Sequence, residues 1–465
     1  MATDNNRGPR PAHVLDPEDI LQQWKGLLSR SLKRIDLHQV ANLVKENREI
    51  AMKFRGKDAA TIINAIDKLL KGGQLPDETQ KRALNLMRRL AGASRQVPKS
   101  YLVGIFTRCK VEKTIFANGG FADVRKGRLK GKDVAIKTIR TSLQDEIEGR
   151  IILIHEAFCK ECVVWMNMSH PNIHQLTAVI IKPDAREFSM VSEMMKNGNI
   201  LIYTKRNKAN RIRLVVDIAR GLEYLHKSGV IHGDLKGPNI LINNETPPQA
   251  CIADFGLSAI APRWCSRHFG YMAPELLSGV QASKEADMYA FGIVVYEVIT
   301  GTRPFGDHRL EELPVLTLQG SRPPAPEDPG AAGFCQGTWE FAERCWDENP
   351  GQRPAARQAV EHFERAAKTS TVVDPGPTVS VREPIYPSVG NSSRNFTRLF
   401  GPPSRSNTGR FQQTAYATRV LVNNRAVPVP TLQAKREPNP LLRMYHHLIS
   451  PRSAPRLEPS PQGGN

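Results

Sequence analysis

The stretch Ile231-His-Gly-Asp-Leu-Lys-Gly-Pro-Asn-Ile-Leu241 decides how this chain is interpreted. Within it, Asp234 is followed two residues later by Lys236 and five residues later by Asn239, between a predicted helix and a predicted strand. A carboxylate can accept a hydroxyl proton, an ammonium group can neutralise a transferring phosphoryl group, and an amide oxygen can bind Mg²⁺. These three side chains therefore indicate phosphoryl-transfer chemistry.

Two further segments offer partners for this chemistry. Downstream, Ala253-Asp-Phe-Gly256 supplies a second carboxylate, Asp254, as a metal ligand. Upstream, the apolar strand Val134-Ala-Ile-Lys137 ends in a lysine, which needs an anion that is either structural or a phosphate of a ligand. Glu161, in a helical segment, is one candidate partner, although an ordinary surface glutamate fits the same pattern.

The segment Ala117-Asn-Gly-Gly-Phe-Ala-Asp-Val124 lies between two strand-like runs. It matches the register of a glycine-rich phosphate loop, in which backbone amides approach phosphate oxygens because no Cβ is in the way. Only Gly119 fills one of the three glycine positions, and Gly120 adds flexibility. By itself this segment is more typical of an ordinary hairpin turn.

The order of these motifs over about residues 105–367 resembles the eukaryotic protein kinase domain. The resemblance implies a bilobal α+β fold with a β-rich N-lobe and an α-helical C-lobe, and ATP and Mg²⁺ as cofactors. It makes Lys137 the ligand of the α- and β-phosphates, held by Glu161, and Asp234 the base or hydroxyl-orienting group. Lys236 would contact the γ-phosphate, and Asn239 and Asp254 would bind the metal.

The same resemblance assigns the ATP pocket and several scaffold contacts. It implies that Ser192 is the gatekeeper before the hinge Glu193-Met-Met195, that Trp165 stacks with Phe255 and His232, that Asp287 anchors the catalytic loop, and that Glu275 pairs with Arg353. The residues expected to contact ATP are Ala117, Asn118, Gly119, Gly120, Val124, Ala135, Lys137, Ser192, Glu193, Met195 and Leu241.

The expected function is a protein Ser/Thr kinase in intracellular signalling, because Lys236 is typical of Ser/Thr kinases at its position. Several segments resemble the tyrosine-kinase-like (TKL) group, especially its fungal members. Two departures bear on activity: Gly233 stands where most kinases have an arginine that pairs with a phosphorylated loop, and His268 replaces a usual threonine. The alternative is an ATP-binding pseudokinase that acts as a signalling scaffold.

Residues 1–95 predict four amphipathic helices, a regulatory or interaction bundle. Helix starts are expected at Asp16-Pro17, Asp36, Asp58 and Pro76, each followed by apolar residues at spacings of three and four. Residues 371–465 contain 14 prolines without sustained periodicity and predict a disordered basic tail. The bundle could support self-association or partner binding.

Charge and cysteine usage narrow the remaining classes. The net charge is +19, of which residues 1–95 carry +7 and residues 371–465 carry +8, so the basicity belongs to the flanks. No zinc spacing or RNA-binding motif accompanies it, so we expect no specific nucleic acid partner. Apolar runs are too short to span a membrane and no secretory signal is evident. Cys159-x-x-Cys162 has the spacing of a redox motif or a zinc half-site, but no second Cys or His pair lies near it, so both cysteines are interpreted as buried or half-buried helix residues. We expect a cytoplasmic protein, with nuclear access left open.

Overall fold

The computed structural model describes most of the chain between residues 17 and 369. The segments outside the description within this span are 30–36, 47–51, 104–108, 119–121, 142–144, 146–148, 183–185, 208, 256–265, 311, 327, 329–333 and 336. The predicted tail, residues 371–465, also lies outside the described residues.

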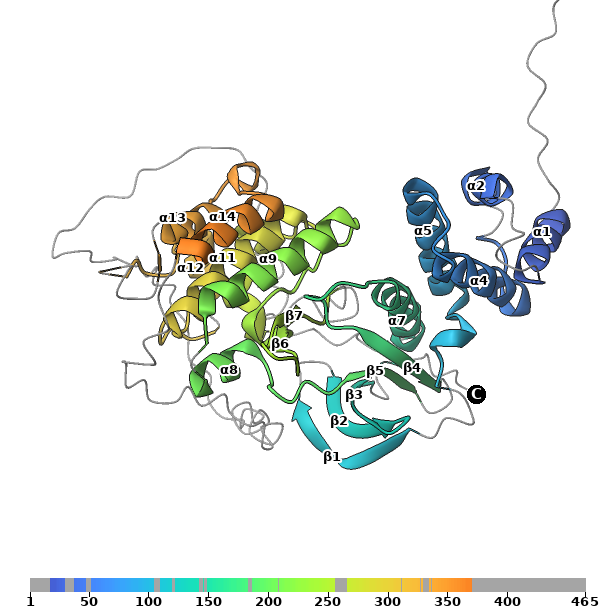
Figure 1. Cartoon of the computed structure of the whole chain (residues 1–465), viewed down its shortest axis with the longest axis horizontal. Helices are drawn as coiled ribbons and strands as arrows, with labels where there is room; N and C mark the ends of the chain where they lie inside the picture. The colour runs from blue at the N-terminus through green and yellow to red at the C-terminus, as the bar shows by residue number, and fades with distance from the viewer. Residues whose placement is uncertain are drawn as a thin grey trace, which may run out of the picture. The chain divides into compact units, whose positions relative to one another are not determined.

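Among the described residues, four α-helices precede the sheet, as the sequence predicts (Figure 1). They bury an apolar stripe that includes Trp24, Ile62 and Leu90. The third helix ends where expected, because Gly72 caps it and Gly73 adopts a left-handed conformation with φ of 65°. The helices are α1 (Pro17–Ser29), α2 (Leu37–Glu46), α4 (Gly56–Lys71) and α5 (Asp77–Ser94).

A five-stranded antiparallel sheet follows, with strand order β1-β2-β3-β5-β4. Side chains alternate between its faces, so that Val134 and Ile136 on β3 are buried in a small core, whereas Ala135 and Lys137 face the other side and are half-buried. Helix α7 (Arg150–Met166) packs on β4 and β5. The strands are β1 (Lys110–Asn118), β2 (Ala122–Leu129), β3 (Lys132–Ile139), β4 (Leu176–Lys182) and β5 (Glu187–Glu193).

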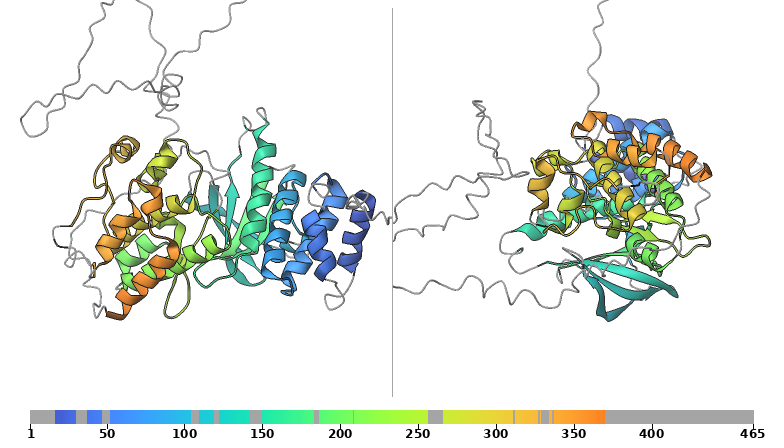
Figure 2. Two further views of the ribbon diagram at one scale, coloured as in Figure 1. Left: turned by 90° about the horizontal axis from the view of Figure 1, so that it is seen from above. Right: turned by 90° about the vertical axis from the view of Figure 1, so that its left-hand side faces the viewer.

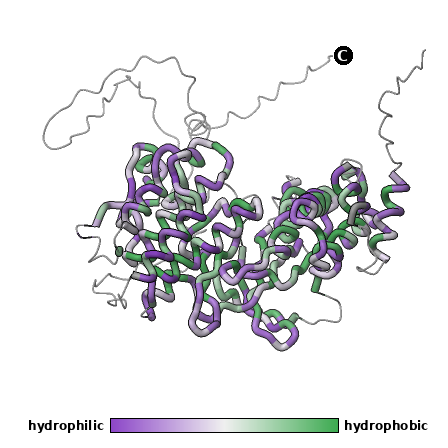
Figure 3. Tube along the Cα trace, turned by 45° about the horizontal axis from the view of Figure 1, so that its top comes forward, coloured by the Kyte–Doolittle hydropathy of each residue, from purple (hydrophilic) through white to green (hydrophobic). Residues whose placement is uncertain are grey.

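The second half of the fold is helical and is built around α11 (Lys284–Thr300). Residues Ala286–Ile299 of this helix are buried on every side, whereas green and purple alternate along most other helices in Figure 3, as expected for helices with one buried face. The other elements are α8 (Ile200–Arg206), α9 (Arg211–Lys227), β6 (Ile240–Ile242), β7 (Ala250–Ile252), α10 (Pro274–Leu277), α12 (Leu313–Leu318), α13 (Thr338–Cys345) and α14 (Ala356–Thr369), with short 3₁₀ turns η2 (Lys99–Tyr101), η4 (Gly237–Asn239), η6 (Ser266–Tyr271) and η7 (Pro350–Gln352).

The helical bundle shares its core with the rest of the fold. Helix α5 packs along α7, and the two lie side by side in the left view of Figure 2. Buried apolar residues of the bundle belong to the same hydrophobic cluster as those of α9 and α11. Within the part of the chain that the structure describes, no helix is long and apolar enough to cross a membrane.

Candidate functional site

The predicted catalytic loop, residues 231–239, is anchored by a buried carboxylate of α11. Asp287 is 2% exposed and accepts hydrogen bonds from the backbone N–H groups of His232 and Gly233, each at 2.8 Å. The ring Nε2 of His226 lies 2.9 Å from the same carboxylate. Gly233 adopts a left-handed conformation, with φ of 73°, which a residue with a Cβ rarely takes. The anchoring role expected of Asp287 is thus visible as three contacts on one carboxylate.

His232 joins the catalytic loop to the strand end that carries Asp254. Its Nδ1 accepts a hydrogen bond from the N–H of Asp234 at 3.2 Å, so the proton of the neutral ring belongs on Nε2, which donates to the carbonyl oxygen of Ala253 at 3.1 Å. Burial lowers the pKa of His232, which keeps the ring neutral. One neutral imidazole therefore sets the spacing between the two aspartate-bearing segments.

Asp234, Lys236 and Asn239 meet in one hydrogen-bonded cluster. The Nζ of Lys236 donates to Oδ2 of Asp234 at 2.7 Å. The Nδ2 of Asn239 donates to the backbone oxygen and to Oδ2 of Asp234, at 2.8 and 3.2 Å. Because the NH₂ group of Asn239 faces Asp234, the amide oxygen lies on the opposite side, where it could bind a cation. The carbonyl oxygen of Asn239 accepts from the N–H of Ala253 at 2.8 Å, which brings Asp254 next to the cluster.

Asp254 forms an ion pair with a lysine of the five-stranded sheet. The Nζ of Lys137, on β3, lies 2.7 Å from Oδ2 of Asp254. Burial pushes the pKa of Asp254 up, but the nearby ammonium groups of Lys137 and Lys236 outweigh it and hold the pKa below its usual value. Asp254 is therefore an anion, with two cations beside it.

Lys137 and Glu161, which are expected to pair, contact other residues in the described part of the chain. Glu161 lies on α7 as expected and is buried, but its Oε1 is 3.7 Å from Nη2 of Arg88, on α5 of the helical bundle. Burial raises the pKa of Glu161 to about 7, against the lowering effect of Arg88. The physical reason is the packing of α5 on α7, which supplies a second cation that spacing around Glu161 cannot reveal.

The residues expected around the adenine lie on neighbouring strands of the five-stranded sheet, except Leu241, which lies on the separate sheet of β6 and β7. Ala135 on β3 is directly opposite Ser192 on β5, and Val124 on β2 is opposite Lys137. Leu241 lies on β6 and bridges to Asn199. Beyond the end of β5, the N–H of Met194 donates to the carbonyl of Asp133 at 3.2 Å; the two hinge residues expected to bind ATP, Glu193 and Met195, flank it.

The predicted phosphate loop is only partly described. Ala117 and Asn118 end β1, where they pair with Val124 and Asp123 of β2. Gly119 and Gly120 lie outside the described residues. Their contacts with a nucleotide therefore stay predictions, as do those of the other proposed ATP-binding residues.

The expected aromatic stack is present. The ring centroids of Trp165 and Phe255 are 5.1 Å apart, and those of Phe255 and His232 are 6.4 Å apart with an edge-to-face arrangement. The indole of Trp165 also donates to the carbonyl of His174 at 2.6 Å. This stack links α7 to the catalytic loop through buried side chains.

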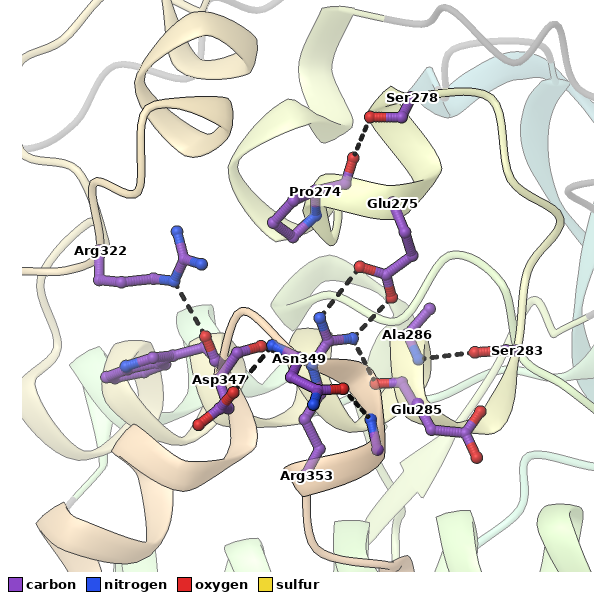
Figure 4. A network of polar contacts seen from close by, with 12 residues as sticks. Pro274, Glu275, Ser278, Ser283, Glu285, Ala286, Arg322, Asp347, Asn349 and Arg353 are labelled. Atoms are coloured by element: carbon purple, nitrogen blue, oxygen red, sulfur yellow. Dashed lines mark hydrogen bonds and ion pairs between the residues drawn. The ribbon is translucent and has the colours of Figure 1, made fainter. Parts of the chain in front are cut away.

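The predicted pair of Glu275 and Arg353 is confirmed. The guanidinium of Arg353 is fully buried and binds both carboxylate oxygens of Glu275, at 2.6 and 3.0 Å (Figure 4). Its remaining donors reach the carbonyl oxygens of Glu285 and Asp347. The pair fastens the segment after the catalytic site to the end of the helical lobe.

Sequence reasoning missed two polar contacts near the site. One is Arg88, for which a basic residue on a helix gives no local signal. The other joins Tyr271 to Glu297 of α11, whose carboxylate accepts from the tyrosine hydroxyl at 2.6 Å. A buried glutamate in an otherwise apolar helix was the available signal. Cys159 and Cys162, by contrast, are both buried in α7. Among the described residues, no three or more His, Cys, Asp or Glu side chains form a group that could hold a metal ion.

The chain combines a small antiparallel sheet, a helical lobe and a hydrogen-bonded Asp-Lys-Asn loop between them. This combination is typical of bilobal phosphotransferase domains. Comparison with known families agrees. Residues 111–363, more than half of the chain, match the protein kinase domain, and the chain belongs to this family.

Individual relatives are similar over the kinase domain. The serine/threonine/tyrosine-protein kinase HT1 of Arabidopsis thaliana is 33% identical over 264 residues, which cover 54% of this chain and 64% of that protein. The dual specificity protein kinase zakA of Dictyostelium discoideum is 31% identical over 261 residues, 51% of this chain and 32% of that protein. The chain thus spans less than two thirds of the length of either relative.

Proposed function

We propose that this chain transfers the γ-phosphate of ATP to Ser or Thr hydroxyl groups of protein substrates, as part of a signalling pathway. The observation that carries this proposal is the single network through Asp234, Lys236, Asn239 and Asp254, to which Lys137 is joined. Phosphoryl transfer depends mainly on positioning and charge neutralisation. Two carboxylates, two ammonium groups and one amide oxygen at one place supply both.

The residues present fit a magnesium nucleotide. Mg²⁺ prefers oxygen ligands and is usually held by one or two protein groups, with phosphates and water completing its shell. The Asp254 carboxylate and the amide oxygen of Asn239 form such a sparse set. Bound Mg²⁺ would neutralise charge on the phosphates, while Lys137 and Lys236 hold phosphate oxygens. Asp234 would orient the acceptor hydroxyl and take its proton.

The assignment of Ser or Thr as the acceptor rests on Lys236. Its ammonium lies against Asp234, where it can also reach a phosphoryl group bound for the same hydroxyl. The relatives carry both serine/threonine and dual specificity names, so tyrosine belongs in any test. A peptide array with Ser, Thr and Tyr versions of each peptide should show labelling of the first two, and equal labelling of Tyr would contradict the assignment.

We also propose that activity does not require a phosphorylated activation segment. Gly233 has no side chain to bind a phosphate, and its N–H is already bonded to Asp287. Ser266, in η6, is the serine to test. Ser266→Ala should keep activity within about tenfold of the parent, which is 1.4 kcal/mol in the barrier. A larger loss would overturn the proposal. His268 lies where no side chain is described.

One observation favours a second candidate, a nucleotide-binding pseudokinase that acts as a scaffold. Glu161 pairs with Arg88, so the carboxylate expected to orient Lys137 is engaged elsewhere. Against this candidate, Asp234, Lys236, Asn239 and Asp254 are all in place. The two candidates differ in whether phosphate leaves the nucleotide.

A transfer assay separates them. The full chain is incubated with labelled Mg-ATP and a generic basic protein, beside Asp234→Asn and Lys137→Met. A catalytic chain should lose more than about a hundredfold of its labelling in either variant. Equal labelling by all three proteins would identify a contaminating kinase. Mg-ATP binding by calorimetry, with no transfer, would establish the scaffold.

A further inference from the structure

The helical bundle contacts the kinase domain at Glu161 of α7, the carboxylate that is expected to orient Lys137. Arg88 projects from α5 to Glu161, with Nη2 and Oε1 3.7 Å apart. The arginine side chain is 45% exposed, whereas that of the glutamate is 6% exposed. A half-exposed cation of the helical bundle thus contacts a buried carboxyl group of the kinase domain.

Other contacts hold α5 and α7 in register around this pair. Gly92 lies so close to Lys160 that a Cβ at position 92 would come within 2.7 Å of Cγ of the lysine. At the end of α7, Nδ2 of Asn167 donates to the hydroxyl of the buried Tyr101 at 2.7 Å. Tyr101 belongs to η2, the 3₁₀ turn that follows the bundle. These contacts join α7 to the bundle at two further points that do not involve Arg88.

Ser100, the middle residue of η2, joins this turn to helix α4 of the bundle. The hydroxyl of Ser100 donates to Oδ2 of Asp67 on α4 at 2.7 Å, and Lys71 binds the same oxygen at 2.9 Å. Asp67 is 5% exposed, so its carboxylate needs these partners. Specific hydrogen bonds of η2 therefore hold the helical bundle against the kinase domain.

Three cations bear on the ionisation and pairing of the buried Glu161: Arg88, Lys160 and Lys137. Burial opposes its ionisation, and Arg88 and Lys160 are the charges that favour it. Lys137, the cation expected on family grounds, is instead joined to Asp254. Lys160 pairs with Glu156, so removal of Arg88 would leave Glu161 without its ion-pair partner, and Lys137 would be the cation able to replace it.

We propose that Arg88 is a positioning residue that acts through Glu161: it draws this carboxylate toward α5, withholds it from Lys137, and so keeps the domain in a low-activity arrangement. The proposal rests on the proposed kinase function. Release of α5 from α7 would return Glu161 to Lys137, orient that lysine on the nucleotide phosphates and raise activity. The bundle would thereby act as an intramolecular brake.

The test compares Arg88→Met with Arg82→Met in the full chain. Methionine keeps an apolar stem for packing and removes the charge. Arg82 lies on the same helix, is 47% exposed and pairs with Glu78 of α5. We expect Arg88→Met to lower the Kd for Mg-ATP, measured by calorimetry, and to raise kcat/KM, each by about fivefold, while Arg82→Met changes neither by more than about twofold.

Two further variants distinguish positioning from a general loosening of the fold. In a Glu161→Gln background, Arg88→Met should change the Mg-ATP Kd by less than about twofold, because the carboxylate through which it acts is gone. Arg88→Lys should keep the parent affinity, because the cation is retained. The same fivefold gain with and without Glu161, or no gain in Arg88→Met, would overturn the proposal.

Failure of this inference can be told from failure of the proposed function. If no variant transfers phosphate but Arg88→Met still binds Mg-ATP more tightly in a Glu161-dependent manner, the inference stands and the catalytic proposal falls. If the parent chain transfers phosphate and Arg88→Met binds and reacts as Arg82→Met does, the catalytic proposal stands and Arg88 has no positioning role.

Discussion

Lys137 Nζ lies 2.7 Å from Asp254 Oδ2, so an ion pair joins β3 of the sheet to the segment after β7. Both side chains are largely shielded from solvent, with 18% and 27% of their surfaces exposed. The low exposure strengthens the attraction relative to a surface pair. This pair fastens the two lobes together across the proposed reaction centre.

The first prediction concerns the coupling energy of that pair. In a double-mutant cycle with Lys137→Met and Asp254→Asn, the two changes should be less than additive by about 1–2 kcal/mol in the free energy of unfolding, measured with urea. The exposed pair of Arg128 and Asp133, with 65% and 46% exposure, is the matched control and should show a coupling below about 0.5 kcal/mol. Equal coupling in both cycles would contradict this reading of the site.

Sequence alone predicted the parts of the site that depend on neighbours along the chain. Asp234, Lys236 and Asn239 lie within six residues, and a helix before them and a strand after them leave few arrangements other than the observed cluster. Helix starts were likewise predictable within about two residues. Helix α4 begins at Gly56, and Asp58 lies in its first turn, where the negative charge interacts favourably with the helix dipole.

Contacts between distant segments were predictable only where the family resemblance supplied them. The pair of Glu275 and Arg353 spans 78 residues, and no local pattern links them. The contact of Arg88 with Glu161 was missed because it depends on how α5 packs along α7, outside the kinase domain. An amphipathic pattern shows that a helix has a buried face but does not identify the helix that covers it.

The second prediction is that Arg353 does not tolerate lysine. A lysine cannot bind both oxygens of Glu275 and also reach the carbonyls of Glu285 and Asp347. Because the arginine side chain is fully buried, Arg353→Lys should cost about 2 kcal/mol and Arg353→Ala about 3–5 kcal/mol of unfolding free energy. Arg357→Ala is the control, because that side chain is 75% exposed in its pair with Glu361 and should change stability by under about 0.5 kcal/mol. A similar effect at both positions would refute the prediction.

The third prediction is a pH dependence from Glu297. Burial raises the pKa of Glu297 to about 7, despite the lowering effect of the Tyr271 hydroxyl. Between about pH 4.5 and 7 the unfolded chain loses this proton while the folded chain keeps it, so stability from this group falls as pH rises. Glu297→Gln removes the effect. Its unfolding free energy relative to the parent should improve from pH 5 to pH 8 by on the order of 1–3 kcal/mol.

The measurement for Glu297 is urea unfolding of parent and variant at both pH values. Any contribution from Glu161, whose pKa is also raised to about 7, cancels because both proteins carry it. Glu361→Gln, on the exposed face of α14, controls for the general effect of losing a carboxylate. A stability difference between parent and Glu297→Gln that stays constant with pH would show that the carboxyl ionises normally.

The fourth prediction is that alanine at Gly221 destabilises the domain although alanine favours helices. Gly221 lies inside α9, where an added Cβ would come within 2.6 Å of the carbonyl oxygen of Asn172 and 3.0 Å of Ile252 Cδ1. That oxygen already accepts the N–H of Ile252 on β7 at 2.9 Å, so it cannot move without loss of the bond. The free-energy cost of overpacking should exceed the gain of about 1 kcal/mol in helix propensity and leave a net cost of about 1–2 kcal/mol in unfolding free energy.

Gly26→Ala is the control. This glycine lies within α1 with nothing within 4 Å of the added Cβ, so stability should stay equal or rise by up to about 1 kcal/mol. Helix α9 leads into the predicted catalytic loop, and β7 leads out to Asp254. The affinity for Mg-ATP should therefore fall together with the thermal midpoint of unfolding in Gly221→Ala. Stabilisation of both variants would mean that α9 and β7 are not packed as closely as the structure shows.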